Sequence, residues 1–289
     1  MKKRVALAVV LFVVALISAY FALEAYANVK LKEKFDRRLA KLPYATSYSR
    51  FHYSLGPNDL EIDGLTLKGE FLSGRLQKLI VDLPFGFREK KFPPYLKVVV
   101  ENGNLRLNFP LLDELLGRSE FNFDLAGWYD FDGNRLDTFF FLKLKKLGSF
   151  SFKMDVDNLN YSTVEWFFEG RTTVNPILRR GELSHLEVVF KNDGLYDTFL
   201  RYAAKQEGTT PADIKKELLS MVRQSFQDET LYKRIGKPLE EFINNPTCLK
   251  VELNPSRPVS LQELKGLVTS KPNVKKVVEE IGLKFSVCG

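Results

Sequence analysis

Four aspartates that lie close together in sequence are the strongest candidates for acid and base chemistry. They are Asp124, Asp130, Asp132 and Asp137, and a close pair of carboxylates is the arrangement that glycoside hydrolysis requires. Their spacing fits better with a solvated strand face that ends in a hairpin turn. A calcium loop is also disfavoured, because Phe141 stands where a bidentate glutamate would be needed.

The other side chains that carry chemistry form no recognisable catalytic or metal-binding set. His52 and His185 are far apart and have no obvious acidic or nucleophilic neighbour. The serines lack a nucleophile-elbow context, and the chain has no glycine-rich phosphate loop. Two cysteines and two separated histidines do not have the spacing of a zinc site. We therefore expect a protein that is not an enzyme and that holds no cofactor and no metal.

Cys248 and Cys288 are the chain's two cysteines. Cys248 opens a strand-like run over residues 248–253, and Cys288 closes another over residues 283–288. If these runs pair as antiparallel strands, the start of one lies opposite the end of the other, which brings the two sulfur atoms within disulfide distance. Two free thiols are the alternative, because the connectivity depends on this pairing.

The N-terminal residues predict a membrane anchor. Residues 1–4 read Met-Lys-Lys-Arg, and the nineteen residues 5–23 contain no charge. As a helix, this run would cover roughly 28 Å, which is close to the hydrocarbon thickness of a bilayer. The basic residues before the run favour a cytoplasmic tail at 1–4 and place the rest of the chain outside the cytoplasm. We expect the anchor to stay uncleaved, although residues 25–27 have the small-x-small form of a cleavage site.

A second basic group follows the apolar run. By simple counting it would place its own side in the cytoplasm, but it is separated from the run by residues 24–29, which carry no positive charge. Residues 24–43 predict an amphipathic stalk helix that ends at Pro43 and either lies on anionic headgroups or extends the anchor. The basic residues expected at the membrane surface are Lys30, Lys32, Lys34, Arg37 and Arg38.

Residues 44–192 alternate apolar and polar residues in the manner of β-strands. Asn102-Gly103 between residues 96–100 and 105–109 predicts a hairpin turn, and residues 130–134 predict another. We expect a curved, mostly antiparallel β-sheet in meander order with phenylalanines along one face. The expected lining is Phe121, Phe123, Phe139, Phe141, Phe150 and Phe152.

The phenylalanine lining allows two interpretations. A broad apolar surface with few directed polar groups suits a groove that binds lipid. The alternative is a core face that the protein's own helices cover. The formal net charge of +7 suits anionic lipids or acidic partners. Nucleic acid is not an expected partner, because no DNA-binding or RNA-binding motif accompanies the charge.

Residues 193–289 change to helical periodicity, apart from the two cysteine-bearing runs. Thr210-Pro211 and residues 260–263 are signals of helix N-termini, and a last helix is expected over residues 272–281. The expected fold class is therefore α+β. It comprises a single N-terminal transmembrane helix, a large antiparallel sheet and a helical C-terminal region with two short strands.

Three segments carry a family resemblance. Residues 60–67 read LEIDGLTL, residues 98–107 read VVVENGNLRL and residues 124–129 read DLAGWY. With a short basic N-terminus and one anchor, residues 1–190 resemble the AsmA-like and YdgA-type envelope proteins of bacteria. The resemblance implies a single-pass inner-membrane protein whose C-terminal domain lies in the periplasm and handles phospholipid. The alternative is a scaffold or assembly factor that binds another envelope protein without a small-molecule ligand.

Overall fold

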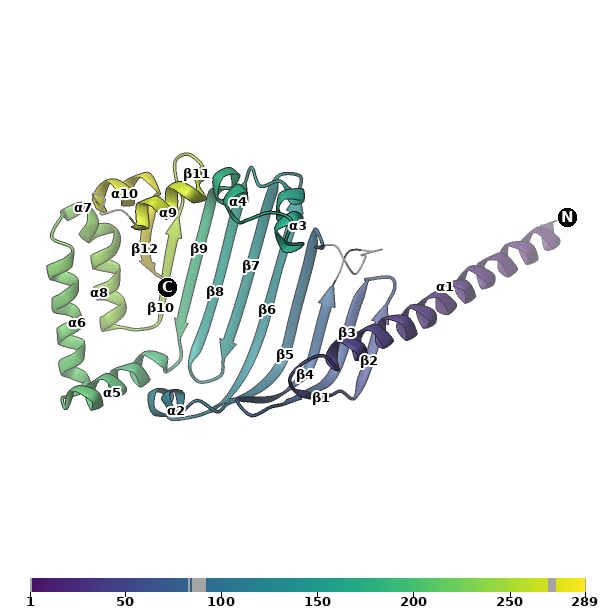
Figure 1. Ribbon diagram of the computed structural model, residues 1–289, viewed down its shortest axis with the longest axis horizontal. Coiled ribbons are helices and arrows are strands. Elements are labelled where there is room, and N and C mark those ends of the chain that lie inside the picture. The colour runs from purple at the N-terminus through teal and green to yellow at the C-terminus, as the bar shows by residue number, and fades with distance from the viewer. Residues whose placement is uncertain (1, 83, 85–91, 270–273, 289) are drawn as a thin grey trace.

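The computed structural model describes residues 2–82, 84, 92–269 and 274–288, without the side chains of residues 2–15, 111, 112, 267–269, 274 and 276. It is an α+β protein built on one large antiparallel sheet, as the sequence predicts (Figure 1). The strands are β1 (Ala45–Ser47), β2 (Arg50–Ser54), β3 (Asp59–Lys68), β4 (Leu72–Asp82), β5 (Tyr95–Leu107), β6 (Glu120–Asp132), β7 (Arg135–Leu144), β8 (Gly148–Asp157), β9 (Glu182–Asn192), β10 (Cys248–Leu253), β11 (Val259–Ser260) and β12 (Leu283–Val287).

The sheet follows the chain in meander order. Its strand order is β1-β3-β4-β5-β6-β7-β8-β9-β10-β12, with β2 paired to β3 and β11 paired to β9. Neighbours in sequence are therefore neighbours in space from β3 to β9, which confirms the predicted meander. The cysteine-bearing strands β10 and β12 pair antiparallel at the edge of the sheet.

Helices gather at the two ends of the strands and at the two edges of the sheet. Figure 1 shows α1 projecting from one edge and α5, α6 and α8 beyond the other. The helices are α1 (Lys2–Leu39), α2 (Pro110–Leu116), α3 (Tyr161–Phe168), α4 (Asn175–Arg180), α5 (Leu195–Glu207), α6 (Pro211–Ser225), α7 (Glu229–Leu231), the π-helix η1 (Tyr232–Gly236), α8 (Lys237–Asn244), α9 (Leu261–Thr269) and α10 (Val274–Glu280).

Two of the predicted helix starts have the expected caps. The Thr210 side chain accepts a hydrogen bond from the Asp213 backbone N–H at the start of α6. The Ser260 hydroxyl accepts one from the Glu263 backbone N–H at 3.0 Å, at the start of α9. Each cap satisfies a backbone donor that has no partner within the helix.

The helix α1 runs without a break from Lys2 to Leu39, so the stalk is an extension of the N-terminal helix. Its side chains dock on β2. Asn28 donates from Nδ2 to the Tyr53 carbonyl at 2.7 Å, and its Oδ1 accepts from the Tyr53 N–H at 2.6 Å. The Phe35 ring contacts Phe51 with ring centroids 5.6 Å apart. Phe35 of the predicted apolar stripe therefore packs on the sheet.

No helix in the described part of the chain is long and apolar enough to cross a membrane. Most of the predicted anchor, residues 5–15, lies outside the side chains that the structure describes.

The predicted hairpin at Asn102-Gly103 is wrong. The strand β5 continues through both residues, and its register with β6 shifts between Val100 and Gly103. Asn102 has a φ of 51°, a conformation that serves a β-bulge as well as a type I′ turn. A Cβ atom on Gly103 would lie 2.4 Å from the Phe123 ring, so the close approach of this ring requires glycine.

The fully buried core is small. One cluster consists of Val156, Leu159, Val164 and Leu183, where α3, α4 and α9 meet the ends of the central strands. A second joins α5 to α6 through Leu200, Ala204 and Ile214. Both clusters lie toward the margins of the sheet, so the middle of the sheet is left without a comparable buried cluster among the described residues.

Candidate functional site

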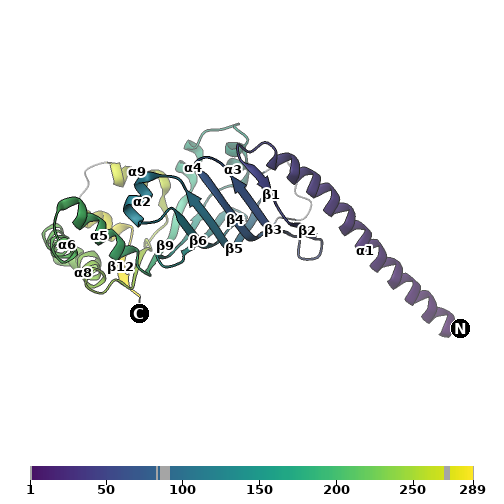
Figure 2. The same ribbon diagram turned by 90° about the horizontal axis from the view of Figure 1, so that it is seen from below.

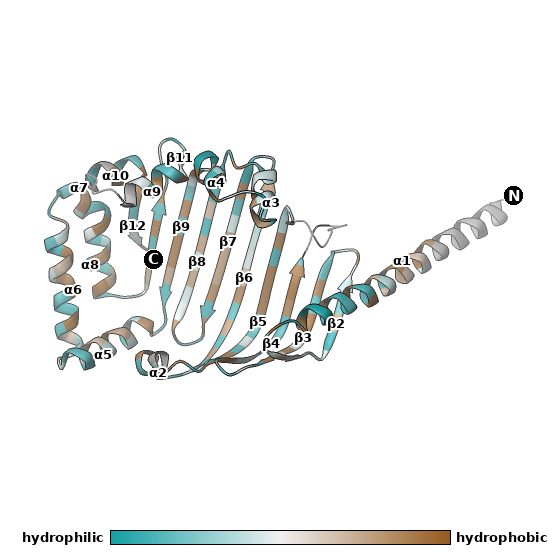
Figure 3. Ribbon diagram, in the orientation of Figure 1, coloured by the Kyte–Doolittle hydropathy of each residue, from teal (hydrophilic) through white to brown (hydrophobic). Residues whose placement is uncertain are grey.

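One face of the sheet is apolar across nine neighbouring strands, and we call it the apolar face. In an antiparallel pair, directly opposite residues point to the same side, so the strand registers define it. Leu125 on β6 lies opposite Val100 on β5 and Leu142 on β7. Its members on the central strands are Leu79, Val81, Val98, Val100, Leu105, Phe121, Phe123, Leu125, Phe140, Leu142, Phe150, Phe152, Val188 and Phe190. Figure 3 shows the alternating hydropathy along these strands.

Most of the apolar face is only half-buried. Val100 and Phe121 are buried, but Leu79, Leu125, Phe140 and the other members on the central strands, except Phe150, have intermediate exposure. Phe150 is 38% exposed. Figures 1 and 2 show helices at the ends and edges of the sheet rather than over its middle. Among the described residues, helices therefore cover the margins of the apolar face and none lies over its centre.

Phe139 and Phe141 lie on the other face, which corrects their predicted place in the lining. They pair with Trp128 and Ala126 on β6, and with Lys153 and Ser151 on β8. The correction follows from strand parity. The odd-numbered positions of β6 lie opposite the even-numbered positions of β7, so Phe140 faces the same side as Phe121, Phe123, Phe150 and Phe152.

Stacked aromatic rings close one end of the apolar face. The Phe92 ring lies between Tyr129 and Phe168, with centroids 5.1 and 4.2 Å away and nearly parallel planes. The Tyr129 hydroxyl donates to the Pro93 carbonyl at 3.0 Å, and the Tyr161 hydroxyl donates to the Phe92 carbonyl. Burial raises the pKa of the Tyr129 hydroxyl, so this group stays protonated as a donor.

An apolar pocket lies at the other end of the face. Its volume is about 300 Å³, at the lower end of the range for ligand pockets. It is bounded by α2, β9 and α5, and a hydrogen bond of 2.7 Å from Gln206 to Glu114 joins the two helices. Phe190 belongs to both the pocket and the apolar face, so the two surfaces are continuous. The lining residues are Leu115, Leu116, Phe190, Leu195, Tyr196 and Phe199.

The opposite face of the sheet is charged and paired. Asp155 is buried, with ion pairs of 3.4 Å to Arg135 and 3.8 Å to Lys153. Lys250 pairs with Glu187 at 2.6 Å, which raises the pKa of this lysine. The opposite face thus carries charged pairs together with the aromatic residues Trp128, Phe139 and Phe141.

The four candidate aspartates lie on this charged side of the sheet. Asp124 accepts a hydrogen bond from the Asn102 backbone N–H at the bulge, at 2.9 Å. Asp137 pairs with Arg135 at 2.7 Å and lies opposite Asp130 in register, whereas Asp132 lies opposite Arg135. Among the described residues, no group of three histidine, cysteine, aspartate or glutamate side chains is arranged to hold a metal ion.

The predicted basic group lies along the stalk part of α1. Lys30 pairs with Glu33 at 3.5 Å and Lys32 pairs with Asp36 at 2.9 Å. Arg37 donates to the Glu33 carbonyl at 3.2 Å. At about 1.5 Å per residue, Arg38 would lie roughly 20 Å beyond residue 23. All five basic residues of the group are exposed on this helix.

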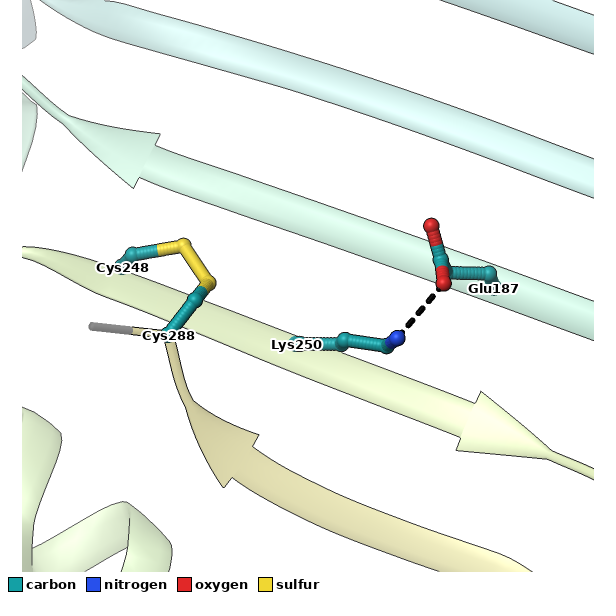
Figure 4. Close-up of a disulfide and its surroundings, with 4 residues drawn as sticks. All are labelled: Glu187, Cys248, Lys250 and Cys288. Carbon is teal, nitrogen blue, oxygen red and sulfur yellow. Dashed lines mark ion pairs between the residues drawn. A yellow bond between two sulfur atoms is a disulfide. The ribbon is translucent and has the colours of Figure 1, made fainter.

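The two cysteines form a disulfide in the structure. Cys248 and Cys288 have Cα atoms 5.3 Å apart, and Figure 4 shows their bond beside the Lys250–Glu187 ion pair. The bond joins β10 to the residue that follows β12, and it closes a loop that carries α9 and α10.

A comparison with models of protein families gives a match. A family model described as an uncharacterized protein matches residues 141–287. This range begins in β7 and includes the apolar pocket's β9 and α5 walls, Cys248 and the C-terminal helices, and it ends one residue before Cys288. No curated protein matches the chain.

Proposed function

The chain belongs to this family of uncharacterized proteins, and we propose that it binds the acyl chains of phospholipids on its apolar face. The observation that carries the proposal is the half-buried state of the central apolar residues. Apolar surface left in water forgoes roughly 25 cal/mol for each Å², and an extended exposed apolar surface is typical of a binding site. The fourteen central members of this face are all apolar, which suits a hydrocarbon ligand better than a polar one.

The dimensions of the apolar face suit acyl chains. Adjacent strands lie about 4.8 Å apart, so the six intervals from β3 to β9 span roughly 29 Å. A phospholipid tail in a bilayer covers about half of the hydrocarbon thickness, or roughly 15 Å. The face is therefore long enough for an acyl chain that crosses several strands, with the apolar pocket at one corner.

The proposal includes a membrane anchor at residues 5–23. The uncharged run and the three basic residues before it favour a single span with the sheet outside the cytoplasm. The firm docking of α1 on β2 would then hold the apolar face beside the membrane that supplies the lipid. The resemblance to AsmA-like proteins suggests a bacterial inner membrane with the sheet in the periplasm.

A charge placed on the apolar face tests this function. Phe150→Asp introduces a carboxylate at the most exposed phenylalanine of the central strands, whereas Ser151→Asp introduces the same charge one residue later on the opposite face. Full-length variants are purified and their bound lipid is measured by native mass spectrometry. We expect F150D to carry at least ten-fold less bound phospholipid than the wild-type protein, and S151D to carry the wild-type amount.

Two results would contradict the proposal. One is a wild-type protein without phospholipid mass, and the other is equal lipid content in the two variants. A lipid-free protein that crosslinks to one stoichiometric protein partner would favour the scaffold function instead. Circular dichroism in the near ultraviolet checks that both variants keep the wild-type fold.

A further inference from the structure

One turn of α3 presents three large aromatic side chains to solvent. Trp166 is 48% exposed, Phe167 37% and Phe168 62%. One turn earlier, the same helix carries the buried residues Thr163 and Val164, and Val164 belongs to the core cluster. The fold therefore holds α3 in place while it leaves this aromatic edge outside the core.

The aromatic edge lies at the end of the sheet nearest to the proposed anchor. Because the strands alternate in direction, the β2–β3 turn and the connection from β8 to α3 lie at the same end of the sheet. In that turn, the Gly56 N–H donates to the Tyr20 hydroxyl at 3.0 Å, and the Leu55 N–H donates to Glu24 at 3.4 Å. Tyr20 and Glu24 lie at the boundary of the uncharged run.

Two exposed arginines lie on the helix beside the aromatic edge. Arg179 and Arg180 are exposed in the last turn of α4, which packs beside α3. Neither arginine has an acidic partner among the described residues. The acidic residue that follows α3, Glu169, already pairs with Arg171 at 3.0 Å. Exposed aromatic rings with nearby arginines are typical of surfaces that bind the interfacial layer of an anionic bilayer.

We infer that Trp166, Phe167 and Phe168 form a second membrane contact and insert into the headgroup layer of the anchoring bilayer. The inference rests on the anchor that the proposed function includes. It goes beyond that function because it fixes the orientation of the sheet relative to the membrane. The end of the sheet that carries the Phe92 stack then faces the lipid surface. An acyl chain would then reach the apolar face without crossing a wide layer of water.

The two tryptophans of the chain give a direct test. The Trp128→Phe variant keeps Trp166 as its single tryptophan. The Trp166→Phe variant keeps Trp128, which stacks on Phe139 at 6.1 Å on the charged side of the sheet. Each full-length variant is reconstituted into phosphatidylcholine–phosphatidylglycerol vesicles whose acyl chains are brominated close to the headgroups. We expect W128F to lose at least half of its fluorescence and W166F to lose less than a tenth.

Flotation of the same vesicles separates this inference from the proposed function. If both variants float with the vesicles and W128F is quenched, the membrane contact is supported. If both float and W128F keeps its fluorescence, the contact at α3 is overturned while the anchor stands. If neither variant floats, the anchor fails and the inference fails with it.

Discussion

Phe150 on β8 and Phe190 on β9 lie directly opposite each other, and Phe190 also lines the apolar pocket. This pairing makes the pocket a continuation of the half-buried apolar face. The Phe190 ring contacts the Phe242 ring on α8, with ring centroids 6.1 Å apart. The contact between sheet and C-terminal helices therefore shapes the end of the surface that we propose binds acyl chains.

Filling the apolar pocket should shorten the chains that the protein accepts. Leu116→Trp places a larger ring in a space of about 300 Å³, so we expect the preference for 18-carbon over 12-carbon phospholipids to fall at least five-fold. Native mass spectrometry of protein equilibrated with an equal mixture measures this ratio. Met221→Trp, at an exposed position of α6, is the control. An unchanged ratio in L116W would show that the pocket does not take part in binding the acyl chain.

The neighbours Phe140 and Phe141 should respond differently to a charge. Phe140 belongs to the apolar face and Phe141 to the charged face. We expect Phe140→Asp to remove most of the bound phospholipid and Phe141→Asp to leave it in place. Both residues are half-buried, so thermal unfolding of the two variants serves as the control for folding. A larger loss of lipid in F141D would contradict the assignment of the faces.

The disulfide should contribute substantially to stability. Cys248 and Cys288 are 40 residues apart in sequence, and closing a loop of this length stabilises by roughly 3 to 4 kcal/mol in the chain-entropy description. We therefore expect the double variant C248A/C288A to unfold at a clearly lower denaturant concentration. Adding a reductant to the wild-type protein should reproduce this shift and should leave the double variant unchanged. Equal midpoints for the oxidised and reduced wild-type protein would contradict this prediction.

The docking of α1 on the sheet should weaken in acid. The Tyr48 hydroxyl donates to the Asp36 carboxylate, and this bond, together with that from Lys32, lowers the pKa of Asp36 from its ordinary value of 3.8. A lowered carboxyl pKa stabilises the folded protein above the unfolded value, and the stabilisation is lost as the pH falls through the folded pKa. Tyr48→Phe should cost about 1 kcal/mol at pH 7 and less at pH 3.

Hydrogen exchange of the Tyr53 amide, which bonds to Asn28 on α1, measures this docking at each pH. Glu33→Gln is the matched control, because Glu33 pairs with Lys30 on the exposed side of the same helix. Equal exchange in Y48F and the wild-type protein at pH 7 would show that the Tyr48–Asp36 bond does not secure α1.

Local signals made much of the fold predictable. Thr210 and Ser260 cap helices through contacts within three residues, so their roles can be read from sequence alone. The alternation along β6 and β8 likewise predicts strands with one apolar side. By contrast, Asn102 illustrates a local ambiguity, because its positive φ suits a hairpin and a bulge equally well.

The remaining features depend on contacts between distant segments. The face on which Phe139 and Phe141 lie depends on the pairing of β7 with β6 and β8, which no single strand encodes. The apolar pocket combines α2 with β9 and α5, and no sequence signal singles out its residues. The exposed edge of α3 was also missed, because Trp166 and Phe168 have the composition of a core helix and only tertiary packing leaves them outside.

Photocrosslinking tests the central claim most directly. The full-length protein is placed in bilayers that contain a phospholipid with a diazirine in its acyl chain, and the labelled residues are mapped by peptide mass spectrometry after illumination. Our account predicts adducts on Phe140, Phe150 or Phe152 in addition to residues 5–23, with no adducts on Phe139 or Phe141. Labelling confined to residues 5–23 would contradict lipid binding on the apolar face.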